Sequence, residues 1–146
     1  MSLDRAALLA RWQGCNLATL EWLLERPGRD GFLDSKVNPL TLADYGPQDG
    51  LRGPDWTYGW IQGRGLEALA THAAALEGEY PDLAARLDAR ALRLYERLSA
   101  LRDRDGHLFF LYDRALSPVR PEGGGVTAQD RPGGIYTYSD TFAAKG

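Results

Sequence analysis

The sequence predicts an all-α fold built from repeated helical hairpins. Fifteen of the 17 glycines fall in residues 28–65 and 106–146, and glycine marks loops and weakens helix interiors. The glycine-poor segments between these stretches carry apolar residues at helical spacings of three and four. The motif Arg-Asp-Gly-X-Leu occurs twice at an offset of 75 residues, which indicates that one helical unit is repeated.

The first predicted helix covers residues 3–26, and Pro27 ends it. One apolar stripe runs along this helix and is expected to face the core, where Cys15 would be a small buried residue. Residues 28–54 show no helical period, and a loop of this length usually has a function such as ligand binding. The members of the predicted core stripe are Leu8, Trp12, Cys15, Thr19 and Trp22–Leu23.

The second and third predicted helices form a buried and an amphipathic element. The second covers residues 55–76 and is apolar in nearly every direction around its axis, which is typical of a buried helix. The third begins with Pro81, a residue suited to the first helical position, and ends near Arg104 with one clean leucine stripe. A short strand is predicted at residues 107–112 and a loop at residues 117–134.

A fourth helix is predicted to begin near Tyr138. The two copies of the motif, residues 29–33 and 104–108, each follow an amphipathic helix, and residues 60–64 and 136–140 each open the next helix. Alternating amphipathic and buried helices favour two concentric layers, because single repeats cannot bury their own apolar faces. We therefore expect residues 1–146 to form one partial ring, with repeat one at about 1–80 and repeat two at about 81–146, truncated in its inner helix.

Composition excludes several functional classes. The net charge of −3 provides no basic surface for nucleic acid, and no apolar run reaches the length of a membrane span. A single cysteine forms no internal disulfide, and the N-terminus shows no signal peptide. We expect a soluble cytoplasmic protein with no nucleic-acid or membrane partner. No phosphate-binding glycine loop or zinc-ligand spacing occurs, so neither a cofactor nor a metal is expected.

A candidate binding site lies at the start of the second predicted helix. Trp56, Trp60 and Arg64 are spaced four residues apart and would share one helix face, with Tyr58 and Gln62 nearby. Tryptophan rings pack against the C–H faces of sugars, and arginine donates to hydroxyl or carboxylate oxygens. The alternative is that the tryptophans belong to the core and the arginine pairs with an acid. The residues alone leave both interpretations open.

Residues 60–66 (Trp-Ile-Gln-Gly-Arg-Gly-Leu) and 138–144 (Tyr-Ser-Asp-Thr-Phe-Ala-Ala) resemble segments of a known family. They are similar to the N-terminal part of the N-acylglucosamine 2-epimerase superfamily, sugar epimerases and isomerases of the six-hairpin (α/α)6-barrel fold. The resemblance implies an incomplete all-α toroid with short β-hairpin-like segments in its long loops. It also implies sugar-binding roles for Arg64, Trp60 and Tyr138. Tyr58 and Asp140 lie near the same two helix starts and complete the expected substrate-binding set.

The family's chemistry, as the resemblance implies it, is proton transfer beside a sugar carbonyl through an enediolate. Two histidines act as general acid and base there, and they are expected outside this chain, so the chain alone would be inactive. His72 is expected to be a core residue, and His107 has no neighbouring metal ligand in the sequence.

Two other functional classes stay open. One is a glycoside hydrolase or lyase of the same six-hairpin fold, which would need paired carboxylates; Asp140 is the one candidate at an inner-helix start. The other is a non-enzymatic helical binding module. For a chain of two repeats we also expect self-association, because its open edge would be apolar.

Overall fold

The computed structural model describes residues 4–26, 28–34, 36–129 and 137–146. Pro27, Tyr136 and residues 130–134 of the predicted loop lie outside this description. The helices are α1 (Arg5–Glu25), η1 (a 3-10 helix, Pro47–Arg52), α2 (Gly59–Leu76), α3 (Pro81–Asp105) and α4 (Tyr138–Lys145). The strands are β1 (Thr57–Tyr58), β2 (Leu111–Tyr112), β3 (Pro118–Glu122) and β4 (Gly125–Ala128).

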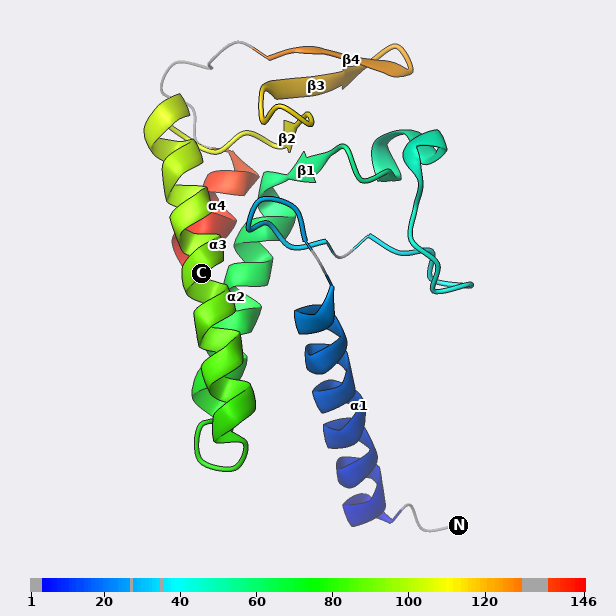
Figure 1. Ribbon diagram of the computed structural model, residues 1–146, viewed down its shortest axis with the longest axis vertical. Helices are drawn as coiled ribbons and strands as arrows, with labels where there is room; N and C mark the ends of the chain where they lie inside the picture. The colour runs from blue at the N-terminus through cyan, green and yellow to red at the C-terminus, as the bar shows by residue number, and fades with distance from the viewer. Residues whose placement is uncertain (1–3, 27, 35, 130–136) are drawn as a thin grey trace.

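The four strands form one antiparallel sheet in the order β1-β2-β3-β4. The sheet lies at one end of the helices, at the top of Figure 1. The prediction of an all-α toroid is therefore wrong, because the described chain has a mixed α and β fold. The prolines and glycines of residues 117–134 favoured a loop in the sequence, whereas the structure pairs residues 118–122 and 125–128 in strands β3 and β4.

A two-residue turn explains the β3–β4 hairpin. Gly123 and Gly124 connect the paired residues Glu122 and Gly125 and have φ angles of 57° and 84°. Hairpin turns of this kind need positive φ at both central residues, and glycine adopts it without a steric penalty. A Gly-Gly pair between two short extended segments was therefore the hairpin signal in the sequence.

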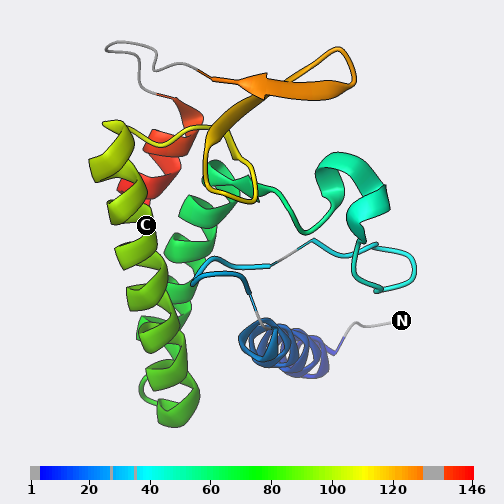
Figure 2. The ribbon, with the colours of Figure 1, turned by 45° about the horizontal axis from the view of Figure 1, so that its top comes forward.

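Helices α2 and α3 form the centre of the fold. They run antiparallel and side by side in both views (Figure 1, Figure 2). The leucine stripe predicted for the third helix is buried, with Leu87 and Leu94 fully enclosed. Helix α3 begins at Pro81 and ends at Gly106, whose φ of 80° makes a left-handed cap. Among the described residues, no helix is both long enough and apolar enough to cross a membrane.

Helix α1 turns a different face to the core from the one predicted. Its core contacts come from Leu17, Leu20, Leu23 and Leu24, of which Leu23 belongs to the predicted stripe. Trp12 is 64% exposed, and Cys15 is also exposed. The predictions that these two residues are buried are wrong. The helix carries apolar residues on two faces. A salt bridge of 2.7 Å between Glu21 and Arg86 of α3 helps to decide which of these faces packs against the core. In both views the ribbon of α1 lies to one side of the α2–α3 pair (Figure 1, Figure 2).

Candidate functional site

A buried glutamine ties the loop before α2 to that helix. The side chain of Gln62 is 3% exposed. Its Oε1 accepts a hydrogen bond from the Leu33 amide at 2.7 Å, and its Nε2 donates to the Leu33 carbonyl at 2.9 Å. We call this pair of bonds the first backbone clamp. The sequence suggested Gln62 as a neighbour of the sugar site, but both ends of its amide are used within the fold.

The second copy of the Arg-Asp-Gly-X-Leu motif is fixed in a corresponding way. The Leu108 amide donates to Asp140 Oδ1 at 2.6 Å, and Thr137 Oγ1 donates to the Leu108 carbonyl at 2.8 Å. We call these bonds the second backbone clamp. Leu33 and Leu108 hold the same position in the motif, so each copy is attached through its main chain to the helix that follows.

Asp140 is occupied by this structural role. Besides the Leu108 amide, its carboxylate accepts a hydrogen bond from the Thr137 amide at 2.7 Å, and its Oδ2 lies 3.0 Å from the Thr137 hydroxyl oxygen. These contacts form a capping box at the start of α4. The structure therefore places this predicted site residue in the helix cap.

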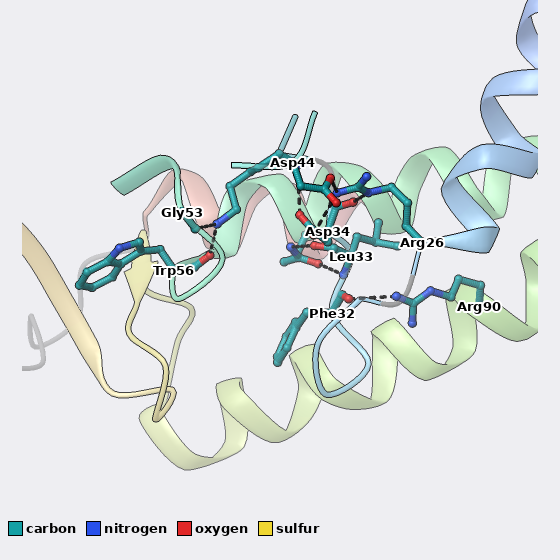
Figure 3. Close-up of polar contacts among 10 residues, drawn as sticks. Arg26, Phe32, Leu33, Asp34, Asp44, Gly53, Trp56 and Arg90 are labelled. Carbon is teal, nitrogen blue, oxygen red and sulfur yellow. Dashed lines mark hydrogen bonds and ion pairs between the residues drawn. The ribbon is translucent and has the colours of Figure 1, made fainter. Parts of the chain in front are cut away.

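Charged side chains hold the loop between α1 and α2 (Figure 3). Arg26 pairs with Asp34 at 3.0 Å and with Asp44 at 2.7 Å. The ammonium of Lys36 donates to the Trp56 carbonyl at 2.6 Å, and burial lowers the pKa of that ammonium.

Trp56 lies before α2 and is not helical, so it does not share a helix face with Trp60 and Arg64.

Three of the predicted site residues do come together, around a fourth that the sequence interpretation omitted. The ring of Phe142 on α4 lies 6.4 Å from the Trp60 ring and 6.3 Å from the Tyr138 ring, centroid to centroid. The guanidinium carbon of Arg64 is 5.2 Å from the centroid of the Phe142 ring. We call these four residues the aromatic–arginine face. Phe142 follows Tyr138 by four residues, and this spacing places both on one side of a helix.

The close approach of α2 and α4 allows this cluster to form. A Cβ atom added to Gly63 would lie 2.6 Å from the Ala143 amide nitrogen, so only glycine lets the two backbones meet here. Arg64 is exposed, and Tyr138 is 78% exposed. Within the described part of the chain, no carboxylate or hydrogen-bond acceptor pairs with Arg64, which disfavours the alternative that Arg64 is a structural ion-pair partner.

Tyr58 does not belong to the aromatic–arginine face. Its hydroxyl donates to the Leu51 carbonyl at 3.1 Å, and its ring packs edge-on against Phe110 with a centroid separation of 5.5 Å. Burial raises the pKa of this phenol. Tyr58 therefore links β1 to the 3-10 helix η1 and to the residue before β2.

His107 is buried beneath the second backbone clamp. The residue is 7% exposed, and its ring lies 4.1 Å from the Phe109 ring. Its Nδ1 is 3.6 Å from Asp140 Oδ2, and neither ring nitrogen has a hydrogen-bond partner among the described residues. A histidine enclosed in this way is not presented to a ligand on the aromatic–arginine face.

The candidate site, the aromatic–arginine face, is thus identified from the arrangement of its four side chains. No family model, curated protein or solved structure matches the chain. In the part of the chain that the structure describes, no group of three His, Cys, Asp or Glu side chains is arranged to hold a metal ion. The face offers three aromatic rings beside one guanidinium group that has no carboxylate partner among the described residues.

Proposed function

We propose that the aromatic–arginine face binds a small carbohydrate. The observation that carries this proposal is the exposed guanidinium of Arg64 beside the rings of Phe142, Tyr138 and Trp60. Aromatic rings accept the apolar C–H face of a sugar, while guanidinium N–H groups donate to its oxygens. Apolar surfaces with a few well-placed polar groups are typical of small-molecule sites.

The resemblance of residues 60–66 and 138–144 to sugar epimerases and isomerases supports the same ligand class. In such chemistry Arg64 would stabilise negative charge that develops on an enediolate oxygen. Neither ring nitrogen of His107 reaches the surface, so we propose that this chain binds its sugar, in the cytoplasm, and does not interconvert it. A hydrolytic role finds less support, because the Asp140 carboxylate already accepts hydrogen bonds from two backbone amides.

Sugar titration followed by NMR tests the proposal. Glucose, mannose and N-acetylmannosamine are added separately to the labelled chain, and shifts are followed at the Trp60 indole and the Arg64 guanidinium. Hydrogen bonds to charged groups contribute about 1.5–3 kcal/mol, so we expect Arg64→Ala to weaken sugar binding by about tenfold or more. Arg120→Ala is the matched control, because Arg120 is an exposed arginine on β3.

Several outcomes would count against this function. Unchanged binding in Arg64→Ala would remove the face as the site, and so would shifts confined to residues away from α2 and α4. If Arg120→Ala weakened binding equally, the effect would reflect net charge. Interconversion of glucose and mannose by the purified chain, followed by carbon NMR, would overturn the proposal that it binds without catalysis.

A further inference from the structure

The aromatic–arginine face carries hydrogen-bond donors that have no acceptor. The guanidinium of Arg64 is exposed and forms no hydrogen bond or ion pair with any described residue. The indole nitrogen of Trp60 is buried and also has no hydrogen-bond partner among the described residues. Both groups donate and cannot accept. On the four side chains of this face, the Tyr138 hydroxyl is the one group that can also accept a hydrogen bond.

Helices α2 and α4, which form this face, each contain one acidic side chain, and both acids are already paired. Glu67 lies three residues beyond Arg64, a spacing that makes the two side chains neighbours on the helix, but its carboxylate pairs with Lys145 of α4 at 2.7 Å. The carboxylate of Asp140 accepts two backbone amides, and its side chain is 13% exposed. The positive charge of Arg64 is therefore not neutralised within the described part of the chain.

We propose that the carbohydrate of the aromatic–arginine face is a hexuronic acid, such as glucuronate, and that Arg64 pairs with its carboxylate. This inference rests on the function proposed above and specifies the class of sugar. An ionised carboxylate is a pure acceptor, and the planar fork of a guanidinium matches its two oxygens. Each hydroxyl of a neutral sugar carries a hydrogen of its own, and the side chains of this face offer it a single acceptor, the Tyr138 hydroxyl.

The arrangement of the face suits a sugar that carries its charge directly beside the ring. In a hexuronate the carboxyl group is attached to a carbon of the pyranose ring. On the protein, the guanidinium carbon of Arg64 is 5.2 Å from the centre of the Phe142 ring, and the exposed Tyr138 ring stacks with Phe142 at 6.3 Å. A carboxylate bound to Arg64 therefore keeps the C–H face of the same sugar next to the aromatic rings.

The single charge of Arg64 favours a carboxylate over a phosphate. A carboxylate carries one negative charge, whereas a phosphate ester carries about 1.5 to 2 negative charges at neutral pH. The other cationic side chain of α2 and α4 is Lys145, and Glu67 pairs with it. One guanidinium balances the charge of a uronate but leaves part of the charge of a sugar phosphate unpaired.

Ligands that share one ring but differ in charge test this inference. NMR titrations of the labelled chain compare glucuronate, its neutral amide glucuronamide, and glucose, followed at the Trp60 indole and at the amides of α4. The attraction between opposite charges in contact at a protein surface is worth about tenfold in affinity, so we expect glucuronate to bind about tenfold more tightly than glucuronamide. Salt screens exposed charges, so high salt should weaken the binding of glucuronate and leave that of glucose unchanged.

Two variants separate the charge of the face from its rings. Arg64→Gln removes the charge, so glucuronate and glucuronamide should then bind with equal affinity. Tyr138→Ala removes a ring and should weaken both ligands alike, so that the preference for glucuronate remains. Arg120→Gln, at an exposed arginine on β3, is the control and should leave both affinities unchanged. Arg64 and Tyr138 are exposed, so neither substitution opens a cavity, and circular dichroism verifies the fold.

The outcomes distinguish this inference from the proposed function. Equal binding of glucuronate, glucuronamide and glucose by the wild type would overturn the assignment to a uronic acid and leave sugar binding in place. A preference for glucuronate that survives in Arg64→Gln would assign the carboxylate to another residue, and tighter binding of glucose 6-phosphate than of glucuronate would indicate a phosphate site; either result overturns the inference. If none of these ligands shifts the resonances of α2 and α4, the proposed function fails together with it.

Discussion

Replacing Gln62 by alanine should destabilise the protein more than any exposed substitution nearby. The change removes both bonds of the first backbone clamp and leaves the amide and carbonyl of Leu33 unpaired. Leu33 is 8% exposed, so water does not replace the lost partners. An unsatisfied buried group costs about 1–3 kcal/mol, and two such groups together lower the free energy of unfolding by about 3 kcal/mol. At about 2–4 °C per kcal/mol for a chain of this size, Tm should fall by about 10 °C.

Urea unfolding followed by circular dichroism measures this loss. Hydrogen exchange at the Leu33 amide should also become faster in Gln62→Ala, which locates the effect. Gln13→Ala is the control, because Gln13 bonds to Glu79 and Tyr80 at an exposed position and should change stability by less than about 0.5 kcal/mol. If Gln62→Ala matched Gln13→Ala in both measurements, the first backbone clamp would not stabilise the fold.

Two further substitutions, at Gly63 and Gly14, and one titration, of Tyr112, test other parts of the fold. Gly63→Ala places a Cβ 2.6 Å from the Ala143 nitrogen, and overpacking should lower the free energy of unfolding by about 2 kcal/mol in urea. Gly14→Ala meets no atom within 4 Å in the middle of α1, so its better helix propensity should raise stability by up to about 1 kcal/mol in the same assay. Burial raises the pKa of Tyr112, so its stabilising effect is complete below pH of about 10 and is lost as pH rises through the folded-state pKa. Near-ultraviolet absorbance should show a phenolate at Tyr112 only when the protein unfolds in alkali, and earlier ionisation in the folded state would contradict this.

The positions of the long helices could be predicted from the sequence, but the face that each one buries could not always be. Helix α3 has one apolar face, so the spacing of its leucines was sufficient to predict the buried side. Helix α1 has two such faces, and the choice between them depends on contacts such as Glu21 with Arg86, which lie 65 residues apart. The strand predicted at residues 107–112 contains β2, but β3 and β4 fall in a segment predicted to be a loop. These strands are short, and β3 includes Pro118 and Pro121, so the prolines and glycines of the segment favoured a loop over paired strands.

The candidate site was predicted in part. Spacing located Trp60 and Arg64, and the resemblance added Tyr138. Phe142, the residue that connects them, follows from the four-residue spacing on α4. Asp140 and Tyr58 were expected to bind a ligand, but their partners are main-chain groups of distant residues. A polar side chain near a helix start can serve a ligand or the backbone, and only three-dimensional contacts separate these roles.

The spans of the two backbone clamps have a consequence for folding kinetics. Leu33 and Gln62 are separated by 29 residues, and Leu108 and Thr137 by the same 29. The entropy lost on closing a loop depends on its length, so both closures face similar entropic barriers. The first loop also needs α3, because Arg90 donates to the carbonyls of Gly31 and Phe32, the two residues before Leu33. Residues 28–34 are therefore held on both sides only after α3 has been synthesised and packed.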